Sequence, residues 1–396
     1  MKIKVNENYK NLKESYLFSE VGKRTRAYAA ANPDKKIIRL GIGDVTLPLS
    51  DVVTEAMHKA VDEMAQKDTF RGYAPEYGYD FLREAVANHY KPYGVTLDTD
   101  EIFVSDGAKS DVGNIVDILG DNEIIIPDPV YPVYMDSNIM SGRKISLIEG
   151  NAENSFLPMP DGLSGEGIII YLCSPNNPTG AVYSHAQLKV WVDFAIRTGS
   201  LIIFDSAYEA FIANDAPHSI FEIEGARECA IEICSFSKTA GFTGTRLGYT
   251  VIPKTLQRQA MNFNAMWVRN RTTKTNGVSY IIQKGGAAVF SLEGQRQIKE
   301  NISVYKNNAK MIMKAFDELG IWYTGGKNAP YVWFKCPCDM GSWEFFDYLL
   351  NEIQVVGTPG EGFGKCGEGY FRFSTFGSPE DTKEAANRLV SLLKNR

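Results

Sequence analysis

The sequence of 396 residues contains no apolar stretch of 18 residues, the length that would indicate a membrane-spanning helix. Its first residues, MKIKVNENYK, lack the apolar core of a secretory signal, so we expect no signal peptide. Acidic residues outnumber basic ones, 48 to 42, and the net charge of −6 argues against nucleic-acid binding. We therefore expect a cytoplasmic globular protein with no membrane or nucleic-acid partner.

The six cysteines are scattered rather than spaced as a disulfide framework, which favours reduced thiols. Cys336 and Cys338 flank a proline, but no second Cys/His pair follows at metal-ligand spacing. The sequence therefore predicts no metal site. Internal repeats and low-complexity segments are also missing, so the chain is expected to form ordinary globular domains.

Short apolar runs alternate with segments of helical periodicity from about residue 100 onward, and 185–199 is a clear helical example. This alternation predicts an α/β fold with a mostly parallel sheet flanked by helices. A long helix is expected over 292–320, followed by a smaller α+β unit. We predict a large domain over 45–290 and a small domain formed by 1–44 with 291–396. The runs that predict strands are 101–105, 123–127, 144–150, 167–173, 201–205 and 230–235.

Polar loops follow five of these runs: DGAKS, DPVYP, SPNNPTG, SAYE and FSKTAG. Ligands of open α/β sheets bind at the carboxyl ends of the strands, so these loops predict a site. Taken singly, the loops also fit structural readings. Asp106 or Ser110 can cap a helix, Asp205 can cap one at a strand end, and Asn176–Gly180 has ordinary turn chemistry.

The segment around Lys238 favours a ligand-binding site over these structural interpretations. Small residues surround Lys238, as a phosphate-binding loop requires, and Arg246 follows eight positions later. Repulsion from Arg246 and partial burial would both lower the pKa of Lys238. A neutral lysine can attack a carbonyl carbon and form a Schiff base, which points to a catalytic rather than a solvated lysine.

Together these segments resemble the class I and II aminotransferases, the group of fold-type I enzymes that depend on pyridoxal 5′-phosphate (PLP). The matching segments are SPNNPTG (174–180), D-x-x-Y (205–208), SFSK (235–238), Arg246 and FRFS (371–374). The resemblance implies a PLP-dependent transferase fold with a large sheet domain and a smaller α+β domain. It also implies a homodimer whose subunits share their active sites.

The resemblance assigns a role to each matching residue. Lys238 would link covalently to PLP and move the substrate proton, with Asp205 holding the pyridine nitrogen and Tyr208 tuning the imine. Arg372 would bind the substrate α-carboxylate as a bidentate fork. Tyr131 would stack on the ring, and Asn177 would bond its 3′ oxygen. The phosphate-binding residues would be Ala108, Lys109, Ser235, Ser237, Arg246 and, from the other subunit, Tyr73.

Other segments resemble a narrower group, the LL-diaminopimelate aminotransferases. These are residues 14–24, LGIGDVTLPL (40–49), RGYAPEYG (71–78), SDGAKSD (105–111) and TKTNG. The substrate of that group carries an amino acid at each end, and Glu76 would meet its distal ammonium. The chain has Tyr77 where the group commonly has glutamine. By this resemblance the residues that recognise substrate are Tyr16, Gly43, Glu76, Lys109, Tyr131, Asn177, Asn276 and Arg372, with Glu76 and Asn276 from the other subunit.

The expected reaction is reversible transamination of LL-2,6-diaminopimelate with 2-oxoglutarate to give tetrahydrodipicolinate, glutamate and water, in lysine and diaminopimelate biosynthesis. The first alternative is an aromatic or aspartate aminotransferase of broader specificity, or a β-lyase of the same fold. Glu76 would then be an ordinary surface acid. The second alternative is a PLP-binding sensor without catalysis. About forty residues precede LGIGD, too few for the DNA-binding region such sensors carry, and the charge is acidic.

Overall fold

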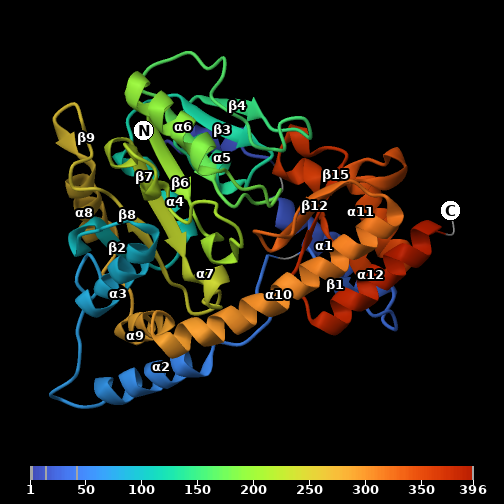
Figure 1. Ribbon diagram of the computed structural model, residues 1–396, viewed down its shortest axis with the longest axis horizontal. Coiled ribbons are helices and arrows are strands. Elements are labelled where there is room, and N and C mark those ends of the chain that lie inside the picture. Colours follow the sequence, from blue (N-terminus) through green and yellow to red (C-terminus); the bar gives the residue numbers. More distant parts are fainter. Residues whose placement is uncertain (1–2, 14–15, 42, 395–396) are drawn as a thin grey trace.

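The computed structural model describes residues 3–13, 16–41 and 43–394 (Figure 1). Residues 14–15 and 42, which belong to two of the segments quoted above, lie outside the described residues. No helix in the described part of the chain is long and apolar enough to cross a membrane.

A seven-stranded sheet forms the core of the larger part of the molecule, with strand order β2-β8-β7-β6-β5-β3-β4. All strands run parallel except β8, which is antiparallel to β2 and β7. The six predicted strands are present, and β8 is the one the sequence analysis did not foresee. The strands are β2 (Ile102–Ser105), β3 (Ile124–Asp128), β4 (Ile145–Glu149), β5 (Ile169–Cys173), β6 (Leu201–Asp205), β7 (Ala230–Ser235) and β8 (Gly248–Val251).

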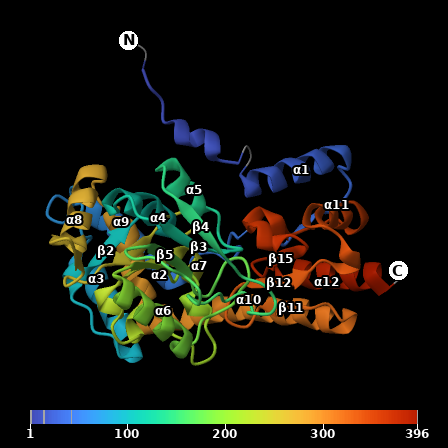
Figure 2. The ribbon, with the colours of Figure 1, turned by 90° about the horizontal axis from the view of Figure 1, so that it is seen from above.

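Helices cover both faces of this sheet, and α5 and α6 lie on opposite sides of it in Figure 2. This explains why β2, β3, β5 and β6 are buried along their whole length. The predicted helix 185–199 is α6, begun by a capping box of Ser184 and Gln187 and ended by Gly199. The helices around the sheet are α2 (Asp51–Met64), α3 (Asp80–Tyr90), α4 (Ala108–Ile115), α5 (Val133–Met140), α6 (His185–Thr198), α7 (Phe236–Thr239), α8 (Phe263–Lys274) and α9 (Tyr280–Val289).

The long helix predicted over 292–320 is α10 (Leu292–Leu319), which Gly320 caps. It runs from the region of α2 and α9 to the smaller sheet (Figure 1). Its first half packs Ile302 and Tyr305 into the core of the large sheet, and its second half packs Phe316 into a separate core. One continuous helix therefore sets the distance between the two cores.

The smaller sheet has the order β11-β12-β15-β14, and all its pairings are antiparallel. The N-terminal segment lies against this part, because Ile38 pairs with Val355 and Arg24 forms an ion pair with Asp347 at 2.8 Å. The domain bounds given above stay a prediction. The elements here are α1 (Leu17–Ala31), β1 (Ile38–Arg39), β11 (Tyr323–Gly325), β12 (Tyr331–Lys335), α11 (Ser342–Ile353), β13 (Val355–Val356), β14 (Thr358–Pro359), β15 (Tyr370–Ser374) and α12 (Pro379–Lys394).

Short elements complete the fold. A two-stranded hairpin joins β9 (Gln257–Arg258) to β10 (Met261–Asn262). The 3₁₀ helices are Glu7–Asn11, Lys91–Tyr93, Thr99–Glu101, Val116–Ile118, Glu209–Phe211, Ile220–Glu222, Ala226–Glu228, Pro337–Asp339, Gly360–Phe363 and Lys365–Gly367.

The core of the smaller part depends on aromatic packing, which gives a test of stability. Phe334 is fully buried, with ring centroids 4.4 Å from Phe316 and 5.0 Å from Phe373. We expect Phe334→Ala to lower the free energy of unfolding by about 3–5 kcal/mol, through lost burial and the cavity left behind. Urea denaturation measures this. Leu292→Ala, at a side chain that is 94% exposed, should change it by less than about 0.5 kcal/mol. Equal effects would contradict the packing described here.

Candidate active site

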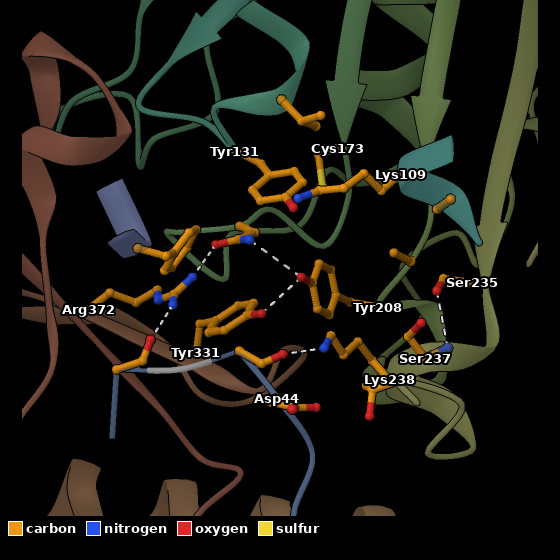
Figure 3. A pocket seen from close by; sticks show the side chains of 18 of the residues that line it. Asp44, Lys109, Tyr131, Cys173, Tyr208, Ser235, Ser237, Lys238, Tyr331 and Arg372 are labelled. Atoms are coloured by element: carbon orange, nitrogen blue, oxygen red, sulfur yellow. Dashed lines mark hydrogen bonds between the residues drawn. The ribbon is translucent and has the colours of Figure 1, made fainter. Parts of the chain in front are cut away.

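A cavity of about 610 Å³ opens at the carboxyl ends of β5, β6 and β7, between the large sheet and the smaller one (Figure 3). Its wall includes Asp205 at the end of β6, Ser235 at the end of β7, and Arg372 from β15. The polar loops singled out in the sequence therefore meet at one edge of the sheet. The predicted site residues that line the cavity are Gly43, Ala108, Lys109, Tyr131, Asn177, Asp205, Tyr208, Ser235, Ser237, Lys238, Arg246 and Arg372.

Lys238 lies on α7, the short helix that begins where β7 ends. The Ser235 hydroxyl caps this helix by accepting from the Ser237 backbone N–H at 3.1 Å. The Lys238 ammonium donates to the Gly43 carbonyl and has no carboxylate within ion-pair distance in the described part of the chain. Burial lowers the pKa of Lys238 to about 8, with Asp44 opposing the shift and Arg372 and Arg246 adding to it. Both predicted causes, burial and the charge of Arg246, therefore lower this pKa, and burial is the larger of the two.

Asp205 is a buried carboxylate, and burial raises its pKa above the ordinary value. Two hydrogen bonds oppose that shift. The Tyr134 hydroxyl donates to Oδ2 at 2.6 Å, and the Ala207 backbone N–H donates to Oδ1 at 3.0 Å. A carboxylate held in this way is suited to a cationic N–H group in the cavity.

Hydrogen-bond donors gather where α4 and α7 begin. Arg246 Nη1 donates to the Ser237 hydroxyl at 3.3 Å. Gly107 precedes α4 with a φ of 127°, and a Cβ there would lie 2.3 Å from Arg246 Nη2, so only glycine fits. The backbone N–H groups at the start of α4, the two serine hydroxyls and the guanidinium together form a site suited to a phosphate.

Arg372 is fully buried in the wall between the two sheets. Its guanidinium donates to Asn177 Oδ1 at 2.6 Å and to the Gly41 carbonyl at 2.7 Å, and lies 4.4 Å from the ring centroid of Tyr331. Its Nε has no hydrogen-bond partner. No carboxylate reaches it among the residues described, and burial lowers its pKa. An arginine in this state is complementary to an anionic ligand.

Tyr208 and Asn177 belong to the same network. Asn177 Nδ2 donates to the Tyr208 hydroxyl at 3.4 Å. That hydroxyl shares a 2.8 Å hydrogen bond with the hydroxyl of Tyr331 (Figure 3). The sequence analysis missed Tyr331 and Tyr134. Both occur in apolar stretches, YVWFK and YPVYM, that are typical of core tyrosines, so no local signal distinguishes them.

Lys109 and Tyr131 form another part of the wall, and Tyr16 lies close to both. The Lys109 ammonium lies 5.4 Å from the ring centroid of Tyr16 and 5.7 Å from that of Tyr131. Burial raises the pKa of Tyr131 to about 12, so its hydroxyl stays protonated at neutral pH. Tyr16 thus lies next to Lys109, and the substrate-binding role of both stays a prediction.

Tyr73, Glu76 and Asn276 do not line this cavity. Tyr73 is 85% exposed, and Glu76 and Asn276 are exposed as well. Such exposure is expected in a single chain if these three residues contribute to the active site of a second copy. Their roles, like those of the other site residues, stay predictions.

The fold is an α/β fold with a ligand-sized cavity at the carboxyl ends of its parallel strands, and comparison with known families gives the class of protein. Residues 35–389 match the family model "Aminotransferase class I and II", and the chain belongs to that family.

Among curated relatives, the LL-diaminopimelate aminotransferase of Lachnospira eligens is 53% identical over 98% of this chain and 100% of its own length. That of Azobacteroides pseudotrichonymphae is 52% identical over 99% of both. The solved LL-diaminopimelate aminotransferase of Chlamydomonas reinhardtii is 42% identical, with a TM-score of 0.94 over 99% of both chains. The aromatic aminotransferase of Pyrococcus horikoshii is 28% identical, with a TM-score of 0.83 over 94% of this chain and 99% of its own.

The lowered pKa of Lys238 gives a test of pH dependence. Below its pKa the amine is protonated and cannot attack an aldehyde, and above it the amine is neutral. The rate at which added PLP attaches to Lys238 in the apoprotein should therefore rise with pH, with a midpoint near 8 instead of 10.5. Stopped-flow absorbance gives the rate, and borohydride reduction with peptide mapping identifies the lysine. A midpoint near that of an exposed lysine would contradict the buried environment.

Proposed function

We propose that this aminotransferase exchanges an amino group between LL-2,6-diaminopimelate and 2-oxoglutarate, with PLP as its cofactor. The observation that carries the proposal is the pair of cations, Arg372 and Lys109, that face one cavity without a carboxylate partner in the described residues. Diaminopimelate has a carboxylate at each end, one for each cation. The curated relatives that are 52–53% identical over nearly the whole chain support this substrate.

The residues present fit PLP. The donors around Gly107 and Arg246 suit its phosphate, since a side chain at 107 would fill that space. Asp205 suits a protonated pyridine nitrogen, and Tyr208 and Asn177 suit the 3′ oxygen. PLP supplies an electron sink for the carbanion that forms when the substrate α-carbon loses its proton.

The chain's own groups bind the substrate and move its protons. Arg372 binds the α-carboxylate through two parallel N–H groups, and this orients the α-carbon toward Lys238. The Lys238 amine, whose pKa is near 8, removes the α-proton as a general base. Asp205 would hold the ring N–H, and its two hydrogen bonds oppose the burial that raises its pKa.

The reaction balances as follows. Diaminopimelate gives its amino group to 2-oxoglutarate, which becomes glutamate, and the donor becomes a 2-amino-6-oxo acid. That product loses water as its amine closes on its own ketone, which yields tetrahydrodipicolinate.

We also propose a homodimer with shared sites, in which Tyr73, Glu76 and Asn276 of a second copy complete each cavity. Glu76 would then pair with the distal ammonium of diaminopimelate. Its exposure in the single chain supports this role, because an exposed carboxylate is free to meet a second molecule.

The function is tested with purified holoenzyme, 2-oxoglutarate and a panel of amino donors: LL-, meso- and DD-diaminopimelate, aspartate and phenylalanine. We expect LL-diaminopimelate to give the highest kcat/KM and to release glutamate in equal amounts with the cyclic product. Lys238→Ala should abolish turnover. A preference for phenylalanine or aspartate would overturn the substrate and favour the broader aminotransferase. Protein that binds PLP and converts no donor would favour a sensor.

Glu76→Gln tests specificity. It removes the negative charge that would meet the distal ammonium, so kcat/KM for LL-diaminopimelate should fall about 10- to 100-fold, the range expected for a charge-assisted hydrogen bond. The glutamate half-reaction has no distal ammonium and should change less than about twofold. Single-turnover spectra of each half-reaction measure this.

Glu84→Gln is the matched control, because Glu84 is exposed on α3 and makes no ion pair within the described residues. It should leave both half-reactions unchanged. Equal losses in both half-reactions of Glu76→Gln would remove Glu76 from substrate recognition.

A further inference from the structure

Tyr331 contacts two active-site residues, Arg372 and Tyr208, that were predicted from separate segments of the sequence. It begins β12 of the smaller sheet, yet its fully buried side chain belongs to the core of the larger part. Its ring lies 4.4 Å from the Arg372 guanidinium, and its hydroxyl lies 2.8 Å from that of Tyr208 (Figure 3). One side chain thus contacts both the arginine proposed for the α-carboxylate and the tyrosine proposed for the cofactor.

The hydrogen bonds around Tyr208 can be counted. A tyrosine hydroxyl has one proton to donate and two positions at which to accept. Asn177 Nδ2 can only donate, so it occupies one accepting position of Tyr208. The Tyr331 hydroxyl has no other partner in the described part of the chain, so when it donates to Tyr208 it occupies the second. The single proton of Tyr208 then has to point away from both, into the cavity.

The surroundings leave Tyr331 little freedom. A Cβ at Gly43 would lie 3.0 Å from its hydroxyl, and the Phe376 ring is 6.2 Å from its own in an edge contact. Burial raises the pKa of both Tyr331 and Tyr208, so both hydroxyls stay protonated at neutral pH. The pair therefore has two possible arrangements: either the Tyr331 hydroxyl donates to Tyr208, or the Tyr208 hydroxyl donates to Tyr331.

We infer that Tyr331 is a positioning residue: its hydroxyl donates to Tyr208 and so commits the Tyr208 proton to the 3′ oxygen of PLP, while its ring supports Arg372. This rests on the proposed function. Donation to the 3′ oxygen stabilises that oxygen without a proton, so it lowers the pH at which the bound cofactor loses its proton. A tyrosine that itself accepts a hydrogen bond is a stronger donor, and Tyr331 thereby strengthens the effect.

The test compares Tyr331→Phe with the wild-type holoenzyme by titrating the absorbance of bound PLP with pH. Removing the hydroxyl should raise the spectroscopic midpoint by about 0.5–1 pH unit, the effect of one hydrogen bond. The KM for amino donors should change less than about twofold, because the ring beneath Arg372 is kept. An unchanged or lowered midpoint would overturn the inference, since a hydroxyl that accepted from Tyr208 would on removal free the proton for the cofactor.

Tyr331→Leu removes the ring as well. It should show the same spectroscopic shift and also raise KM for diaminopimelate and glutamate alike by about 3- to 10-fold, through loss of the cation–π contact with Arg372. An unchanged KM would overturn the role of the ring. The equal effect on both substrates separates this result from that of Glu76→Gln.

Tyr183→Phe is the matched control. Tyr183 is buried and donates one 2.8 Å hydrogen bond to the Pro158 carbonyl, but it does not line the cavity. It should leave the spectroscopic midpoint unchanged, and a shift equal to that of Tyr331→Phe would mean that any buried hydroxyl has this effect. If wild-type protein binds no PLP, the proposed function fails. If PLP binds and the Tyr331 variants titrate normally, this inference alone fails.

Discussion

The site depends on a buried guanidinium that has no carboxylate beside it in the described chain. Moving an unpaired charge out of water is costly, and Arg372 recovers only part of that cost from Asn177, the Gly41 carbonyl and the face of Tyr331. Its Nε has no partner at all. The fold can sustain this because two separately packed cores hold Arg372 between them, and α10 sets their separation. The missing negative charge beside Arg372 is the reason for proposing that the cavity binds a carboxylate.

The same charge acts on Lys238. Burial is the main cause of its lowered pKa, and the positive charge of Arg372 lowers it further. Under the proposed function, a carboxylate bound to Arg372 would offset that repulsion and so make the Lys238 amine a stronger base when substrate is bound. Binding and proton transfer would then be linked by electrostatics across one cavity.

Most of the large sheet could be predicted because its strands are short apolar runs, four of them buried along their whole length, and five of the predicted runs are followed by a polar loop. Asp205 and Lys238 were conspicuous for the same reason, since Asp205 ends a buried strand and Lys238 lies three residues after one. Tyr331 and Tyr134 could not be predicted. Their partners, Tyr208 and Asp205, lie 123 and 71 positions away along the chain, and an apolar segment with one tyrosine does not indicate which way its hydroxyl points. Strand β8 was missed because four residues after a glycine-rich loop show no clear alternation.

The choice between amino donors depends on different groups from those proposed for proton transfer. Diaminopimelate and glutamate share the α-amino acid that the proposal assigns to Arg372 and Lys238, and both carry a distal carboxylate that could meet Lys109. Diaminopimelate differs from glutamate in having two more carbons and a distal ammonium, and only the ammonium adds a charge. Two carboxylates line the cavity in the described chain, Asp205 and Asp44. Asp205 suits the pyridine nitrogen, and Asp44 lies close enough to Lys238 to affect its pKa. A carboxylate for the distal ammonium is therefore best supplied from outside the chain, and in the proposed homodimer Glu76 of the second copy would supply one without placing another charge beside Lys238.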